Sequence, residues 1–222
     1  MIKIENTEVY GWETAIRGMR NPMNSWDKSD SLWKEKIIGF KEGEYAFEFY
    51  VGNKDLTLMK QLVKAGTDHG KFMRMINVTL DITAPLYWWK EFDTYKVGTV
   101  RNSCSTMHKI ADKEFTLDDF SHEHLIDDAK EHLEETIKML NESRDCYLNW
   151  DDYYSKGEII NTIHDKKVIW WQMIQLLPSS YNQRATVQLN YQVFRNMYRV
   201  RKDHKLDEWR EFCKWIESLP YS

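Results

Sequence analysis

The chain has 222 residues, 42% of them hydrophobic, and its 10 Trp, 12 Tyr and 9 Phe are enough to fill a packed core. This composition excludes a disordered chain. The formal net charge of −4 does not favour a protein that coats nucleic acid, so any site for an anion must be local.

The chain shows no pattern that directs it into or across a membrane. No uninterrupted apolar run approaches the roughly 20 residues that span a bilayer, and the first residues lack a basic segment followed by an apolar one. Cys104, Cys146 and Cys213 are odd in number and widely spaced, which favours a reducing compartment over a disulfide framework. We therefore expect a soluble, cytoplasmic protein.

Short elements are predicted for the first part of the chain. They are a strand over 1–11, a helix over Glu13–Met19, a loop over Asn21–Asp30, a short helix or irregular segment over Trp33–Phe40, a strand over Tyr45–Val51 and a helix over Leu56–Ala65 that Gly66 ends. Arg17 and Arg20 lie three positions apart on the first helix. They are either two solvated arginines or a pair that reaches one anion together.

A strand is predicted over Phe72–Ile82, where apolar and polar residues alternate. One face comprises Ile76, Val78, Leu80 and Ile82, and the other comprises Met75, Asn77, Thr79 and Asp81. Ala84 and Pro85 end this strand, and a helix is predicted to begin with the aromatic run Leu86–Trp89. The following segment, Tyr95–His108, is polar and rich in small residues, which is typical of a binding loop.

Two long helices are predicted next. The first covers Thr116–Leu148 and opens with a T-x-x-D capping pattern, and the second covers about 155–174. On the first, His124, Asp128 and His132 are spaced four apart. That spacing permits a metal site, but a solvated helix face explains it more simply, so we predict no metal. Trp170 and Trp171, on the second, are predicted to lie in the core.

Several short motifs that identify enzyme classes do not occur in this chain. It has no glycine-rich phosphate loop, no G-x-S-x-G and no H-E-x-x-H. Cys104 lies four positions before His108, which permits a thiol nucleophile, although that spacing is not specific.

The densest positive charge lies in Leu177–Trp209, where six Arg or Lys accompany a single Asp between positions 181 and 205. No Gly or Pro interrupts Tyr181–Arg201, so one helix is predicted there. Its apolar face comprises Val187, Tyr191, Phe194 and Tyr198. The charge is either a solvated face or a phosphate or carboxylate site. Nearby Asn and Gln amides, which can bind the edge of a heterocycle, favour the ligand site.

Two blocks of the chain together resemble the flavin-dependent thymidylate synthase family, ThyX. In the first block, Lys64, Gly66 and His69 lead through the predicted strand to Ala84 and Pro85. That family carries the signature R-H-R-x-x-S-x-N-E-x-S-x-R, of which Asn102 and Ser105 match the Asn and the second Ser. Here Tyr95-Lys96-Val97 stands in place of R-H-R, and Ser103 and Met107 replace the Glu and the last Arg.

The second block agrees better with the family. Leu177-Pro178 resembles its L-P turn, and Arg184, Asn190, Asn196 and Arg201 keep its Arg, Asn, Asn and Arg spacing. The resemblance implies that Arg184 and Ser105 bind the nucleotide and that Arg201 lies beside the uracil ring as a substrate-binding and catalytic residue. It implies cofactor-binding roles for five residues: His69, Lys96, Asn102, Asn190 and Asn196.

The resemblance implies an α+β fold, with an antiparallel sheet and long helices in a single domain over 1–222. It also implies a homotetramer with active sites between subunits and FAD as cofactor. The implied reaction transfers a methylene group from methylenetetrahydrofolate to dUMP or a related uridine nucleotide, with hydride from flavin that NADPH has reduced. No membrane or nucleic-acid partner is expected.

Two other functions stay open on the sequence alone. One is a nucleotide-binding module of the same fold without flavin, which the missing signature arginines at Tyr95 and Met107 favour. The other is a nucleic-acid or protein partner for the basic helix.

The spacing of two arginines limits where a shared site can lie, because Arg184 and Arg201 are 17 positions, or roughly 25 Å, apart on a straight helix. Either the helix begins after Arg184, or the two arginines serve sites in different subunits.

Overall fold

The computed structural model describes residues 2–37, 45–155 and 165–222 and has an α+β fold, as predicted. Its main sheet is antiparallel with the strand order β1-β4-β6-β5. The strands are β1 (Lys3–Tyr10), β4 (Asn77–Pro85), β5 (Val100–Ser103) and β6 (Asn182–Asn190). A separate hairpin pairs β2 (Leu32–Ile37) with β3 (Tyr45–Tyr50).

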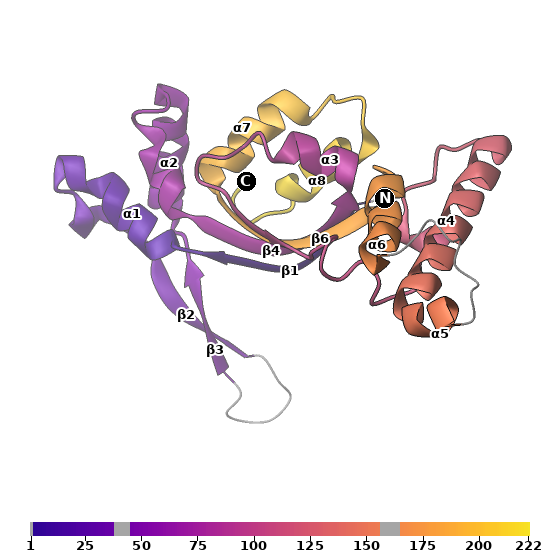
Figure 1. Ribbon diagram of the computed structural model, residues 1–222. Coiled ribbons are helices and arrows are strands. Elements are labelled where there is room, and N and C mark those ends of the chain that lie inside the picture. The colour runs from indigo at the N-terminus through magenta and orange to yellow at the C-terminus, as the bar shows by residue number, and fades with distance from the viewer. Residues whose placement is uncertain (1, 38–44, 156–164) are drawn as a thin grey trace.

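One face of the main sheet is covered by three helices and forms the largest core. The helices are α3 (Leu86–Phe92), α7 (Tyr191–Arg201) and α8 (Asp207–Glu217), which Figure 1 shows together on one side of the strands. Alternate residues of β4 and β6 point into this core: Val78, Leu80, Ile82, Ala185, Val187 and Leu189. The alternation predicted for β4 is thereby confirmed, although Gly70–Met75 before it is a 3₁₀ helix.

The opposite face of the main sheet is polar, because the intervening residues of the same strands point that way. It includes Thr79, Asp81, Arg184 and Thr186, all half-buried or exposed. Figure 1 shows the covering helices α3, α7 and α8 on the other side of the strands. We call this surface the open face.

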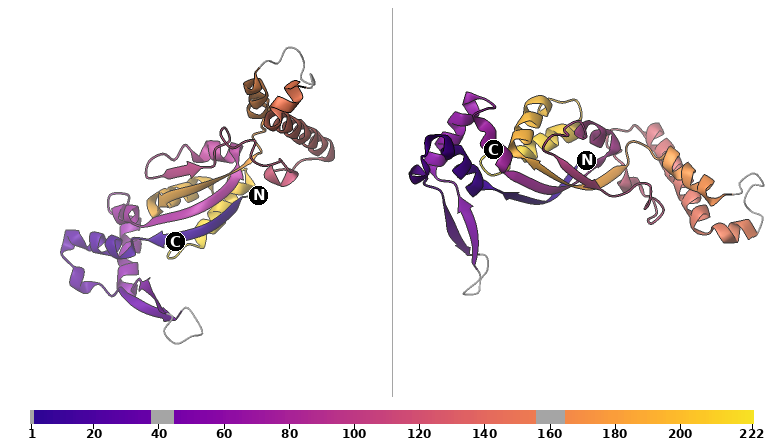
Figure 2. Two further views of the ribbon diagram at one scale, coloured as in Figure 1. Left: turned by 60° about the horizontal axis from the view of Figure 1, so that its bottom comes forward. Right: turned by 60° about the vertical axis from the view of Figure 1, so that its left-hand side comes forward.

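A second core lies at one end of the sheet. It joins α1 (Trp12–Arg20), α2 (Asn53–Ala65) and the 3₁₀ helix Gly70–Met75, and the β2–β3 hairpin extends from this end (Figure 2). The loop between α1 and β2 contains two further 3₁₀ helices, Asn21–Met23 and Trp26–Lys28.

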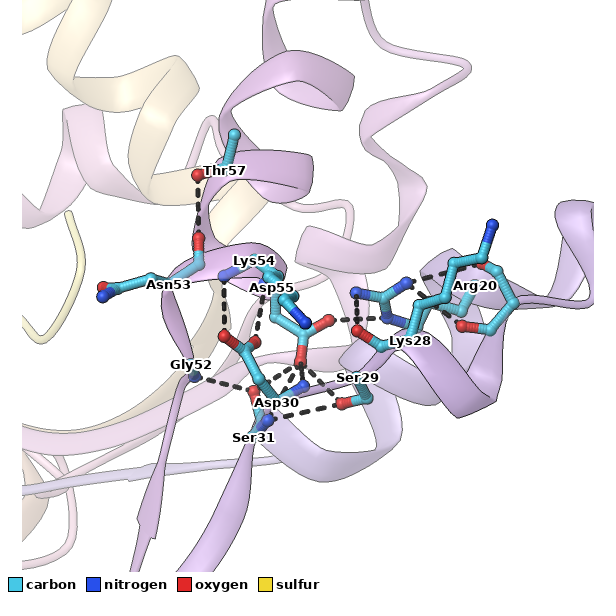
Figure 3. A network of polar contacts seen from close by, with 11 residues as sticks. Arg20, Lys28, Ser29, Asp30, Ser31, Gly52, Asn53, Lys54, Asp55 and Thr57 are labelled. Atoms are coloured by element: carbon cyan, nitrogen blue, oxygen red, sulfur yellow. Dashed lines mark hydrogen bonds and ion pairs between the residues drawn. The ribbon is translucent and has the colours of Figure 1, made fainter.

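The loop between α1 and β2 is held to α2 by a buried polar network (Figure 3). The Arg20 Nε donates to Asp55 Oδ1 at 2.6 Å, and both side chains are almost fully buried. Ser29 and Ser31 hydroxyls donate to Asp55 Oδ2. The Asp30 carboxylate accepts from the first backbone N–H groups of α2, which are otherwise unpaired at a helix start. Arg20 is therefore a structural residue and is not free to bind an anion with Arg17.

The third core lies at the other end of the sheet (Figure 2) and is helical. It contains α4 (Asp127–Leu148) and α6 (Lys166–Leu176), with α5 (Trp150–Ser155) between them. Trp170 packs against this core, but Trp171 is 42% exposed, so the prediction of a buried Trp171 is wrong. Within the described residues, no helix is long and apolar enough to cross a membrane.

Several predicted boundaries are wrong for identifiable reasons. The segment predicted as a helix or irregular over Trp33–Phe40 is strand β2, and its residues 38–40 lie outside the described part. The capping box at Thr116 exists but caps only the 3₁₀ helix Leu117–Asp119, so the long helix begins at Asp127. The helix predicted over about 155–174 is described only from Lys166, because 156–164 lie outside the described residues.

The largest error concerns the helix predicted over Tyr181–Arg201. Its first half is strand β6, which pairs with β4 along its whole length, and only its second half is helix α7. Ala185, Val187 and Leu189 have the two-residue period of a strand, and pairing with β4 stabilises that period. Asn190 ends the strand and caps the helix, because its Oδ1 accepts from the Val193 N–H at 3.1 Å.

Candidate functional site

Arg184 lies at the centre of the open face, where β6 pairs with β4. Its Nη2 donates to Asp81 Oδ2 at 2.7 Å, and its side chain is 49% exposed. Among the described residues, Asp81 is the one side chain bonded to this guanidinium. The remaining N–H groups of Arg184 thus face solvent, in the arrangement that binds a phosphate or carboxylate.

The Asp81 carboxylate is fixed by donors from the two strands that flank it, β1 and β6. Thr186 Oγ1 donates to it at 2.5 Å, and Asn6 Nδ2 donates at 2.8 Å. The hydrogen bonds from Thr186, Arg184 and Asn6 together lower the pKa of Asp81 to about 2. Asp81 therefore stays ionised at neutral pH and orients the guanidinium beside it.

The edge strand β5 brings Asn102 and Ser105 toward Arg184. Asn102 lies opposite Thr186 in the register, and the N–H of Cys104 donates to the Arg184 carbonyl at 2.9 Å. The Ser105 hydroxyl accepts from the N–H of His108 at 3.0 Å and so stabilises a turn. The segment predicted wholly as a loop, Tyr95–His108, thus contains a strand that places Asn102 on the open face.

Arg201 lies on the other side of the sheet, at the C-terminal end of the covering helix α7. Its Nη1 donates to the Glu91 carboxylate, and its Nε donates to the Tyr95 hydroxyl at 2.9 Å. The guanidinium also stacks 4.7 Å from the ring of Trp209, and its side chain is only 16% exposed. The indole of Trp209 donates to the same oxygen of Glu91.

One chain therefore does not bring Arg184 and Arg201 to one small ligand. The two arginines lie on β6 and α7, on opposite faces of the sheet. Of the two arrangements that the sequence left open, the helix does begin after Arg184. Any site that uses both residues must combine different copies of the chain.

The other predicted cofactor residues are spread around the start of α7 and the second core. The Asn190 side chain caps α7 through its Oδ1. Gly98 lies close to this side chain, since a Cβ added to Gly98 would be 2.8 Å from the Asn190 amide nitrogen. The φ of Gly98 is +75°, which favours glycine there. Lys96 and Asn196 are exposed, and His69 is exposed before the 3₁₀ helix Gly70–Met75.

Neither the metal interpretation nor the thiol interpretation gains support from the geometry. His124 Nε2 is 2.9 Å from Asp207 Oδ2, on α8. In the described part of the chain, no three His, Cys, Asp or Glu side chains gather as a metal site. Among the described residues, no hydrogen bond joins the exposed Cys104 thiol to the His108 ring, and the bond from His108 to Ser105 is made by the backbone N–H.

Several residues of the site were missed because their partners are distant in sequence. Asp81 was predicted to face away from the core, but nothing local indicates that it meets Arg184 and Thr186. Glu91 and Trp209, which hold Arg201, come from two different helices. Arg101, on β5, bonds to Asp93 and Gln183 and stacks on Trp89.

Comparison with models of known protein families finds no match, and neither does comparison with curated protein sequences. Comparison with solved structures does find the fold. A crystal structure of thymidylate synthase X (ThyX) from Helicobacter pylori with FAD and dUMP matches with a TM-score of 0.62 and 15% identity, over 98% of this chain and 93% of that chain. A second structure of that enzyme with FAD and dUMP matches with a TM-score of 0.60 and 14% identity, over 98% and 94%. The chain therefore has a ThyX-like fold.

Proposed function

We propose that the protein is a divergent flavin-dependent thymidylate synthase that methylates dUMP or a related uridine nucleotide. The observation that carries the proposal is the end-to-end match to structures crystallised with FAD and dUMP. The second block of the family resemblance, at Arg184, Asn190, Asn196 and Arg201, supports the same conclusion.

In this proposal the nucleotide phosphate binds to Arg184. Its guanidinium is held by one carboxylate, Asp81, and keeps N–H groups free for charge-assisted hydrogen bonds. Asn102 lies opposite Thr186 on the neighbouring strand and adds an amide beside the arginine. The backbone of Ser105 continues from this strand, and its hydroxyl would extend the same site.

Arg201 would act on the base of the nucleotide, in a site that another copy of the chain completes. A guanidinium next to the uracil carbonyls stabilises the negative charge that develops on the ring. Glu91 and Tyr95 hold this guanidinium in a fixed orientation, so little reorganisation is needed when charge develops. Because Glu91 also partly neutralises the charge, we expect Arg201 to be a weaker electrophile than a free arginine.

The residues present are chemically suited to a flavin but supply only part of its site. Amides at Asn102 and Asn196 suit the donor and acceptor edge of the ring, and Lys96 suits the phosphates. These three side chains are exposed. FAD would supply the reducing equivalents for the reaction, with NADPH as the source and methylenetetrahydrofolate as the carbon donor. In this proposal the flavin site lies between copies of the chain in a homotetramer.

The second candidate function is a nucleotide-binding module that has lost the flavin. It is favoured by Tyr95, which stands where the family signature begins with an arginine and which here accepts a hydrogen bond from Arg201. A tyrosine cannot pair with a phosphate as an arginine does. This module would still bind a uridine nucleotide through Arg184.

The absorption spectrum of the protein in the visible range separates the two functions. The synthase predicts a yellow protein, or a colourless one that takes up added FAD and bleaches on reduction. A binding module predicts that dUMP raises the melting temperature and that FAD does not. Light scattering on the same sample would show whether the protein is a tetramer. Failure to bind either ligand would contradict both functions.

A further inference from the structure

A cavity of about 600 Å³ lies away from the proposed nucleotide site, between α2 on one side and α7 and α8 on the other. Figure 1 shows α2 beside the start of α7. The floor is made of buried apolar side chains, among them Trp12, Met59, Phe72 and Phe194. The volume falls within the range of small-molecule sites, and an apolar lining is typical of them.

Three positively charged side chains line the cavity: Lys60 and Lys64 from α2 and Arg195 from α7. The two lysines are four positions apart, so they lie on one face of the helix. None of the three has an ion-pair partner among the described residues. The lining contains one acidic side chain, Glu217, which accepts a hydrogen bond from the Tyr198 hydroxyl at 2.6 Å. The lining side chains therefore carry an excess of positive charge.

The polar groups at this cavity suit an anionic head and do not suit a nucleotide base. No Asn or Gln lines the cavity, so it lacks an amide that offers a donor and an acceptor together to the edge of a base. The Tyr191 hydroxyl donates to the Pro220 carbonyl at 2.7 Å, and the Tyr198 hydroxyl is bonded to Glu217. The ligand-facing interior is thus apolar, with its free charges on lysine and arginine.

We propose that this cavity binds an amphipathic organic anion with an alkyl or aromatic body and a carboxylate or phosphate head. The body would fill the space over Met59 and Phe194, where it is removed from water. The head would pair with Lys60, Lys64 and Arg195. This site goes beyond the proposed function, and its occupancy does not require dUMP or FAD.

The test is isothermal titration of the full chain with decanoate, decyl phosphate and decanol. We expect saturable binding of both anions and about tenfold weaker binding of decanol, because exposed charge pairs each contribute a fraction of a kcal/mol. A stronger response to decyl phosphate than to decanoate would identify phosphate as the head, and the reverse would identify carboxylate. Saturating dUMP should leave both affinities unchanged, so failure of the nucleotide proposal would not affect this result.

Two variants and one control complete the test. Lys60→Gln with Lys64→Gln should weaken decanoate binding about fivefold and leave decanol binding unchanged. Lys54→Gln, an exposed lysine of α2 outside the cavity, should change neither. Val63→Trp should fill the cavity and abolish both, with circular dichroism to confirm the fold. Absent binding, equal binding of decanol, or competition by dUMP would overturn the proposal. If the protein is an oligomer and Val63→Trp dissociates it, the proposal would also be overturned. The surface would then be the contact with a second copy of the chain.

Discussion

Two Arg–Asp pairs of this protein have nearly the same geometry and opposite surroundings. Arg20 and Asp55 meet at 2.6 Å, with side chains that are 5% and 0% exposed. Arg184 and Asp81 meet at 2.7 Å, with side chains that are 49% and 16% exposed. Surroundings rather than geometry therefore distinguish a structural pair from a pair available to a ligand.

The difference lies in what remains unpaired on each arginine. Arg20 donates to Asp55, to the Ser25 carbonyl and to the Lys28 carbonyl, so its guanidinium is used up within the fold. Arg184 donates to Asp81 and to no other described side chain. A ligand can thus bind to Arg184 without breaking a bond that the fold needs.

The largest expected effect is on the buried pair. Asp55→Ala should lower the free energy of unfolding by about 3–5 kcal/mol, because it leaves the charge of Arg20 buried without a partner. It also removes the acceptor for Ser29 and Ser31. Urea titration measures the change.

The double variant Arg20→Met with Asp55→Leu is the matched control for this prediction. Replacing both charges by apolar groups of similar size should cost less than removing Asp55 alone. A single variant Asp55→Ala as stable as the wild type would contradict the structural role of this pair.

The ion pair of Arg201 with Glu91 combines features of the other two pairs. Arg201 is mostly buried, as Arg20 is, but it lies in the proposed site, as Arg184 does. Arg201→Met should lower the free energy of unfolding by about 1–3 kcal/mol, because Glu91 loses its cation and Tyr95 loses a donor. Arg199→Met, at an exposed position of the same helix, should have no effect on unfolding. Equal stability of the two variants would show that the Arg201 contacts contribute nothing to the fold.

The sequence predicts well what local pattern determines. The alternation of Ile76, Val78, Leu80 and Ile82 identifies a half-buried strand, and Gly66 ends α2 with a φ of +114° as predicted. Local pattern does not predict β6 correctly. Val187 and Tyr191 have the spacing of a helix, whereas Ala185, Val187 and Leu189 have the spacing of a strand. Only pairing with β4, about a hundred residues earlier in the chain, selects the strand.

The candidate site was predictable by residue type but not by arrangement. Arg184 and Arg201 were singled out together, yet they lie on opposite faces of the sheet. Their partners, Asp81 and Glu91, come from distant segments that no local pattern connects with them. Long-range pairing, rather than local propensity, decides which charges meet.

Arg184→Ala should act much more on binding than on folding. We expect the affinity for dUMP to fall about tenfold or more, because a charge-assisted hydrogen bond to phosphate is lost. The urea midpoint should change only slightly, since the Arg184 side chain is 49% exposed and Asp81 keeps its hydrogen bonds from Thr186 and Asn6. Arg199→Ala is the matched control at an exposed site. Thermal shift with dUMP measures the effect, and an unchanged shift would contradict the phosphate site.

The smallest expected effect is a titration that tests how Asp81 holds Arg184. The pKa of Asp81 is about 2, below its ordinary 3.8, so its stabilising bonds are fully present above pH 3.8 and are lost as pH falls through 2. In Arg184→Ala this pKa should rise but stay below 3.8, because Thr186, whose bond is the largest cause of the shift, still donates to the carboxylate. Carboxyl NMR shifts measured against pH follow this proton directly. A pKa near 3.8 in the wild type would show that the open face does not fix Asp81, and that Arg184 is held by no carboxylate.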